Sequence, residues 1–216
     1  GTSNFRAGVN AGNSITSGGN YNVTVGDEAG TAITTGDENT VLGYRSGDAI
    51  TTGTKNTALG TESLSADTLG SNSVAIGRSA LANQNFTSAT DAYNTAVGAR
   101  AGVEVTTGVQ NTLIGGLAGD AFTDADYNTG VGFGTLGADT LGSRSVAIGS
   151  SALGAQNFTS ATDVYNVAVG VLAGAAVSTG VHNTFIGGLA GDATDDGNRN
   201  TAVGKGALSA NCGDDN

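Results

Sequence analysis

The sequence predicts an all-β protein, a single elongated parallel β-solenoid of the β-roll or β-helix kind with about 12 coils of 17 residues and essentially no helix. A motif of the form Asn-Thr-x-[Val/Leu/Ile]-Gly, as at 111–115, recurs along the chain at a nearly fixed spacing. A fixed period of this length without a helical pattern is typical of a solenoid, in which each coil buries its apolar side only against its neighbours. Pro is absent and Gly makes up 37 of 216 residues. This composition fits a chain of tight corners whose N–H groups are used in sheet pairing.

The last glycine of each motif, here called the closing glycine, divides the chain into coils. The closing glycines are Gly26, Gly43, Gly60, Gly77, Gly98, Gly115, Gly132, Gly149, Gly170, Gly187 and Gly204. Their spacing is 17 residues except at two steps of 21, which carry the same insertion at 85–91 and 157–163. A 72-residue unit therefore lies over the short one, in 60–131 and 132–203. We expect one solenoid domain over 1–211, a rod about 55–60 Å long at about 4.8 Å per coil, and a flexible tail at 212–216.

Each motif forms one short strand, whose side chains alternate in direction. The residue before the closing glycine is always Val, Leu or Ile, and the residue three before it is always Thr or Val. We name these the aliphatic row and the threonine row, and we expect both to point inward. The middle row between them is small and apolar, and we expect it to point outward and to mediate self-association, because a long apolar stripe marks a contact surface. It comprises Val41, Ala58, Ala75, Ala96, Leu113, Ala147, Ala168, Phe185 and Ala202.

The residue four before the closing glycine is Asn in most coils, and we name this position the asparagine row. Asn tolerates left-handed corners and bonds backbone groups, and stacked Asn side chains can form an amide ladder along the axis. We therefore predict a structural rather than catalytic role for Asn39, Asn56, Asn94, Asn111, Asn128, Asn166, Asn183 and Asn200.

Charge and composition exclude several partner classes. The net charge is −11 and the pI about 4.1, which argues against nucleic acid and anionic membrane as partners, since both need basic patches. No apolar run is long enough to span a membrane, so membrane insertion is not expected. A single cysteine, Cys212, forms neither an internal disulfide nor a zinc site; it is either a bystander or a cross-link between chains.

Motifs that suggest chemistry do not find the context they need. The segment 132–137 matches the dinucleotide fingerprint G-x-G-x-x-G, but that motif requires a strand-to-helix turn, and no helix is predicted. The only histidine, His182, has no candidate triad, dyad or metal partner and is expected on the surface. We therefore predict no enzyme, no catalytic residue and no cofactor.

Three further patterns suggest surface sites. Aspartates cluster in equivalent turns, where oxygen-rich loops can hold Ca²⁺; solvated turns are the competing interpretation. These residues are Asp120, Asp124, Asp126, Asp192, Asp195 and Asp196. Asn85 and Asn157 begin glycosylation sequons in the two insertions, which should be accessible. Thr pairs at 34–35, 51–52 and 106–107 suggest an ice-binding face, but the row is broken elsewhere by Asp and Leu.

The segments 72–82 and 145–152 carry the run Ser-Val-Ala-Ile-Gly, which resembles the repeat of trimeric autotransporter adhesin heads of the Hep/Hag type. The Asn-Thr-x-x-Gly copies are also similar to repeats of phage tail-fibre proteins and large secreted repeat proteins. The resemblance covers nearly the whole chain. It implies a left-handed parallel β-roll, a homotrimer, extracellular display on a cell surface, in secreted form or on a virion fibre, and adhesion to a host, matrix or cell-surface glycan.

The expected function is a non-catalytic structural or adhesive module of an extracellular appendage or fibre, whose principal partner is itself. One alternative is the subunit of a filament stacked end to end through unpaired strand edges, which the lack of an evident bulky charged cap at 1–8 would permit. A second alternative is an ice- or carbohydrate-binding solenoid. A homotrimer and an axial filament differ in their mass and in its dependence on concentration.

Overall fold

A computed structural model describes residues 3–216 and confirms the predicted solenoid. Within these residues every regular element is a strand and none is a helix. The strands are β1 (Phe5–Ala7), β2 (Val23–Val25), β3 (Thr40–Leu42), β4 (Thr57–Leu59), β5 (Gly70–Ser71), β6 (Val74–Ile76), β7 (Thr90–Asp91), β8 (Thr95–Val97), β9 (Thr112–Ile114), β10 (Thr129–Val131), β11 (Gly142–Ser143), β12 (Val146–Ile148), β13 (Thr162–Asp163), β14 (Val167–Val169), β15 (Thr184–Ile186) and β16 (Thr201–Val203).

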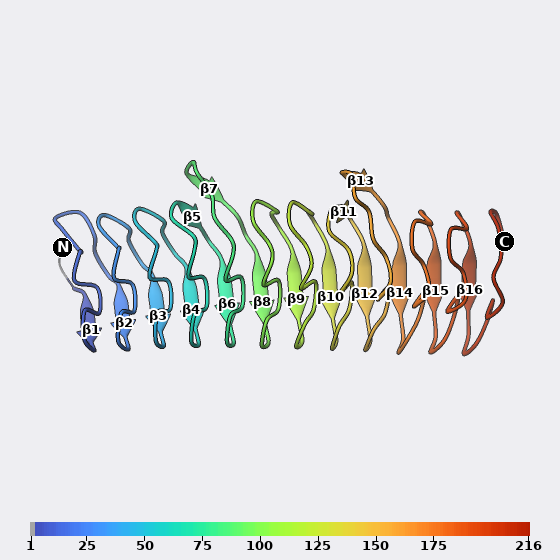
Figure 1. The fold of residues 1–216 in the computed structure, drawn as a ribbon, viewed down its shortest axis with the longest axis horizontal. Coiled ribbons are helices and arrows are strands. Elements are labelled where there is room, and N and C mark those ends of the chain that lie inside the picture. The colour runs from blue at the N-terminus through green and yellow to red at the C-terminus, as the bar shows by residue number, and fades with distance from the viewer. Residues whose placement is uncertain (1–2) are drawn as a thin grey trace.

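The coils stack in chain order into one rod, with the two termini at opposite ends (Figure 1). Each motif strand pairs in parallel with the next to give a 12-stranded sheet in the order β1-β2-β3-β4-β6-β8-β9-β10-β12-β14-β15-β16. The register advances by one coil at each step, so that Val41 pairs with Ala58 and Ala58 with Ala75. Every row defined from the sequence is therefore a straight line along the rod.

The two insertions leave this path and form small additional sheets. Strand β5 pairs with β7, and β11 pairs with β13, each in parallel. Both pairs project from the same side of the rod in Figure 1. The equivalent hydrogen bonds at the two sites show that the 72-residue repeat in the sequence is also a repeat in the structure.

The predicted direction of the strand side chains is wrong. The middle row is buried inside the chain: Val41, Ala58, Leu113 and Phe185 have no exposed surface, and the same holds for Ala75, Ala96, Ala147 and Ala168, with Ala202 at 3%. These residues form the core and offer no surface to a second chain, so they cannot be the self-association row. The aliphatic and threonine rows point outward instead.

The interior is narrow, and its volume is balanced between two positions of each coil. Where the middle row holds Ala58, the residue four after the closing glycine is the buried Leu64. Where it holds Phe185, that residue is Gly191, and a Cβ there would lie 2.5 Å from the Phe185 ring. Because interiors are close-packed, a large side chain at one position requires a glycine at the other. This is why small residues serve as the core row.

The asparagine row forms a buried ladder. Asn128 Nδ2 donates to the Gly142 carbonyl at 2.9 Å and to Asn111 Oδ1 at 3.2 Å, while its own Oδ1 accepts from the Ser145 N–H at 2.9 Å. Equivalent bonds recur at the other asparagines of the row. The ladder satisfies backbone groups at the corner that would otherwise be buried without partners.

The closing glycines are required by both conformation and space. Gly115 has φ of +134°, and a Cβ there would lie 2.4 Å from the carbonyl oxygen of Gly132 in the next coil. No side chain fits at such a distance. Successive coils therefore touch backbone to backbone at this corner, which explains why glycine ends the motif.

Residues 212–216, expected to form a flexible tail, are bonded to the last coil. The Asn216 N–H donates to Asn200 Oδ1 at 2.9 Å, and the Thr201 N–H donates to the Asn216 carbonyl at 2.7 Å. Asn216 therefore occupies the next position of the asparagine ladder.

Candidate functional site

The most extensive surface feature is the outer face of the 12-stranded sheet, formed by the aliphatic and threonine rows. Leu42, Leu59, Ile114, Ile148 and Ile186 are each between 39% and 44% exposed. From β2 to β16 the aliphatic row contains only Val, Leu and Ile, and the threonine row only Thr and Val. The face therefore carries no charge in a protein of net charge −11.

The size of this face is unusual for an isolated chain. Twelve strands at a spacing of about 4.8 Å and three residues at about 3.3 Å give roughly 500 Å² of flat sheet. Contiguous apolar patches on monomers rarely exceed a few hundred Å², and larger ones mark interaction sites. With the corners that flank the strands included, the face approaches the roughly 800 Å² per partner of a standard interface.

Two rows of left-handed residues bound this face. The first corner row directly precedes the asparagine row, and the second lies two residues after the closing glycine. Lys55 and Glu62, with φ of 60° and 57°, are the two corners of one coil. Towards the C-terminal end, the first corner row becomes an aromatic stack: the Arg144 guanidinium lies 4.6 Å from the Tyr127 ring centre, and Tyr165 stacks on His182 at 5.7 Å.

His182 is exposed and belongs to this stack. The stack was not predicted, although its residues all precede the asparagine row in successive coils. Each ring covers the face of its neighbour, so the stack presents ring edges rather than open ring faces. Cation–π and stacking contacts of this kind stabilise an exposed row by modest amounts.

A second feature missed from the sequence is a buried polar cluster beneath each insertion. Gln84 Nε2 donates to Asp67 Oδ2 at 2.6 Å and to Ser73 Oγ at 3.0 Å, and Gln84 Oε1 accepts from Asn94 Nδ2 at 2.9 Å. Burial raises the pKa of Asp67, while hydrogen bonds from Gln84 and from backbone N–H groups act in the opposite direction. The available signal was a polar residue at a position that other coils fill with buried residues such as Ile50.

The second copy of this cluster contains Asp139, Gln156 and Ser145. Gln156 Nε2 donates to Asp139 Oδ2 at 2.6 Å and to Ser145 Oγ at 3.2 Å. Burial raises the pKa of Asp139 as well. Because each carboxylate is satisfied by N–H donors and has no open space beside it, the clusters hold the insertions in place and do not form a reaction site.

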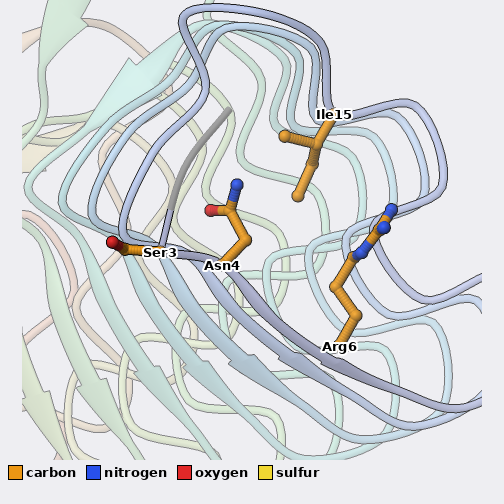
Figure 2. A pocket seen from close by; sticks show the side chains of 4 residues that line it. All are labelled: Ser3, Asn4, Arg6 and Ile15. Carbon is orange, nitrogen blue, oxygen red and sulfur yellow. The ribbon is translucent and has the colours of Figure 1, made fainter.

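A hollow of about 180 Å³ lies at the N-terminal end, lined by Ser3, Asn4, Arg6 and Ile15 (Figure 2). Arg6 pairs in register with Thr24 and so occupies the middle-row position of the first coil. Its Nη1 donates to the Gly12 carbonyl at 3.0 Å. The expectation that 1–8 lacks a bulky charged residue at the end of the rod is therefore wrong: Arg6 lies at that end. The hollow contains no carboxylate or second titratable group to pair with Arg6.

The six aspartates considered for calcium are not brought together. Within residues 3–216, no group of three or more His, Cys, Asp or Glu side chains is placed to hold a metal ion. Several of the six already accept bonds from the preceding coil: Asp124 from Thr107, Asp126 from the Val109 N–H, and Asp195 from Ser178. Asp120, Asp192 and Asp196 lie elsewhere on the same turns.

The glycosylation candidates Asn85 and Asn157 are exposed in the projecting insertions, and each Oδ1 accepts a hydrogen bond from a threonine of the preceding coil, at 3.1 and 3.3 Å. Their modification stays a prediction. Cys212 is a free thiol whose Sγ lies 3.2 Å from Thr194 Oγ1.

The threonine pairs considered for ice binding lie outside the outer face. Hydroxyls of Thr34, Thr51 and Thr106 donate to backbone carbonyls of the following coil at 3.0–3.1 Å. They stabilise the stack and have no free donor for a lattice of water. The hydroxyl row that does line the sheet face is the threonine row.

The segment 132–137 forms a strand end and a turn, without the helix that a dinucleotide site requires. Nor does any helix among residues 3–216 have the length and apolar character needed to cross a bilayer. No family model, curated protein or solved structure matches this chain.

Proposed function

We propose that this chain is a non-catalytic structural module that self-associates through the outer face of its sheet to form a rigid extracellular shaft or head. The observation that supports this most strongly is the unbroken exposed aliphatic row from β2 to β16. An uncharged sheet face of this length is stabilised when a second apolar surface removes it from water, by about 25 cal/mol per Å² buried. The partner with the same length and period is another copy of the chain.

The proposal moves the self-association surface from the middle row to the aliphatic row. A homotrimer is the simplest assembly, because three narrow faces can enclose a central apolar core along the rod axis. The projecting insertions then lie on the outside of the assembly, where they are available for adhesion to a surface glycan or matrix. Extracellular display is part of this proposal and rests on the resemblance of the repeat.

Self-association is tested by light scattering across a dilution series with two matched variants of one coil. Leu59→Asp places a charge on the outer face, and Thr52→Asp places the same charge on an exposed residue outside it. We expect the wild type and Thr52→Asp to retain one constant multiple of the chain mass, and Leu59→Asp to give single chains with an unchanged circular dichroism spectrum. A single-chain mass for the wild type at micromolar concentration would refute the proposal.

End-to-end filaments are the alternative mode of association. They would appear in the same dilution series as a mass that grows with concentration, and Leu59→Asp would leave that growth unchanged because the face is not used. Arg6 at the N-terminal end of the core disfavours this mode, since a charge would be buried at every junction.

Ice binding is a second candidate function, favoured by one observation. The threonine row places Thr hydroxyls and methyl groups in a straight line beside the aliphatic row on a flat sheet, for instance at Thr95, Thr112 and Thr129. A regular, uncharged and rigid array of this kind can order water. Thermal hysteresis of single chains, abolished by Thr112→Lys, would support it; its absence would reject it.

A further inference from the structure

We infer that the assembled chains run parallel and in coil-by-coil register, with the first corner row of one chain packed against the second corner row of the next. This inference rests on the proposed self-association and specifies the arrangement of its partner. It follows from the charges at the two corners that bound the outer face.

Opposite charges stand at the two corners of the same coil in the N-terminal part of the rod. The coil of β3 has Glu38 at the first corner and Arg45 at the second, and the coil of β4 has Lys55 and Glu62. The strand between the corners separates them within one chain. Rotation about an axis along the rod brings the first corner of one chain to the second corner of its neighbour at the same height, so Lys55 meets Glu62 and Glu38 meets Arg45.

These groups are available for such contacts. Among the ion pairs of the described residues, Lys55, Glu38 and Glu62 take part in none, while Arg45 pairs with Glu28 and Asp48 at its own exposed corner. The later cations of the first corner row are already neutralised within their own chain: Arg144 by Asp163, and Arg199 by carboxylates of the C-terminal segment. The unpaired charges are therefore confined to the coils where the opposite corner carries their complement.

The remaining coils follow the same rule with uncharged groups. In the coil of β8, Tyr93 at the first corner corresponds to Arg100 at the second, which suits a cation–π contact. In the coil of β14, the exposed Tyr165 corresponds to the exposed Leu172. Both corner rows thus change from charged to largely aromatic or apolar towards the C-terminal end.

An antiparallel assembly would mismatch these rows. With all twelve strands overlapping, the fourth strand, β4, would face the ninth, β12, and like corners would meet. Lys55 would then lie beside Arg144, and Arg45 would lie beside Leu172 after pairing of the third strand with the tenth. Like charges and unpaired charges against apolar groups disfavour association and select against a wrong partner geometry.

The arrangement is tested by disulfide cross-linking of single-cysteine chains in a Cys212→Ser background. Leu59→Cys lies on β4 and Ile148→Cys on β12, both on the outer face. In the parallel arrangement each variant cross-links to itself under mild oxidation, and a mixture of the two gives no mixed product. An antiparallel assembly gives mixed products only, and that result, or the absence of any cross-link in an assembled sample, overturns the inference while the proposed function stands.

Charge reversal tests the corner contacts independently. We expect Lys55→Glu to raise the dissociation constant of the assembly about tenfold at low salt, and Lys55→Glu with Glu62→Lys to restore it to within about threefold. No rescue by the double variant would overturn the register. A single-chain mass for the unmodified protein would instead refute self-association itself, so the two failures are distinguishable.

Discussion

Phe185 and Ile186 are neighbours on β15 and separate the two possible directions of the strand. Phe185 is fully buried and Ile186 is 42% exposed. Phe185→Ala removes a buried ring and leaves a cavity, which costs about 3–5 kcal/mol of the free energy of unfolding. Ile186→Ala removes a partly solvated side chain, and we expect a cost below about 1 kcal/mol in single chains.

The packing also predicts a specific rescue of Phe185→Ala. In the coil of β4, Ala58 is accompanied by Leu64, whereas Phe185 is accompanied by Gly191. Adding Gly191→Leu to Phe185→Ala reproduces the pairing of β4, including a leucine at positive φ, since Leu64 has φ of 50°. We expect the double variant to recover more than half of the lost stability.

Urea unfolding followed by circular dichroism measures both effects, at protein concentrations where single chains dominate so that assembly does not contribute. The reasoning would be refuted if Ile186→Ala cost more than Phe185→Ala. It would be refuted in part if Gly191→Leu gave no recovery, since the balance between the two positions would then not determine the packing. Cooperativity must be checked with a second probe, because repeat proteins can unfold in segments.

Three further predictions address the ladder, the corner and the buried carboxylates. Asn128→Ala leaves buried backbone groups without partners and should lower the free energy of unfolding by about 2–4 kcal/mol in urea titrations. Gly115→Ala should unfold the coil locally and lose hydrogen-exchange protection there, whereas Gly116→Ala, whose Cβ would be 3.5 Å from its nearest neighbour, should be tolerated. Because burial raises the pKa of Asp67 and Asp139 in the folded chain, folding takes up protons, so stability is greatest at low pH and is lost as the pH rises through the folded-state pKa. The melting temperature should rise on acidification from pH 7 towards pH 4, and the Asp67→Asn/Asp139→Asn variant should reduce this dependence.

Each of these three has an outcome that contradicts it. Full stability of Asn128→Ala would mean that water replaces the amide at the corner. Equal protection factors for the two glycine variants would show that the backbone contact between coils is not tight. A melting temperature that falls on acidification, with no difference between wild type and the double Asn variant, would show that the two aspartates titrate normally.

The period, the closing glycine and the asparagine row made the coil predictable from the sequence. The direction of the strand was not, because both faces of it are apolar and the usual contrast between a polar and an apolar side is missing. The decisive clue was Asn128: its amide bonds buried backbone, and alternate residues share a face, so Gly130 two residues later must also point inward. The balance of Ala58 with Leu64 is a second clue that row-by-row inspection of size could have found.

The buried clusters were hidden for a different reason. Asp67 and Gln84 are 17 residues apart, which is one coil, but each alone resembles an exposed polar residue of a turn. Only the position within the coil, where other copies have Ile50 or Phe122, marks them as internal. The corner charges likewise have meaning only once the outer face that they bound is known.

The 72-residue repeat makes length an easily inherited variable. One unit contains four coils and one insertion, and its two ends present identical rows to their neighbours, so a further tandem copy would extend the rod by about 19 Å without creating a new kind of contact. Recombination between units 60–131 and 132–203 would add or remove whole units in the same way. Selection could thus set the reach of the projecting insertions from whatever surface bears the rod by counting gene segments, while every coil keeps the packing already tested in its predecessors.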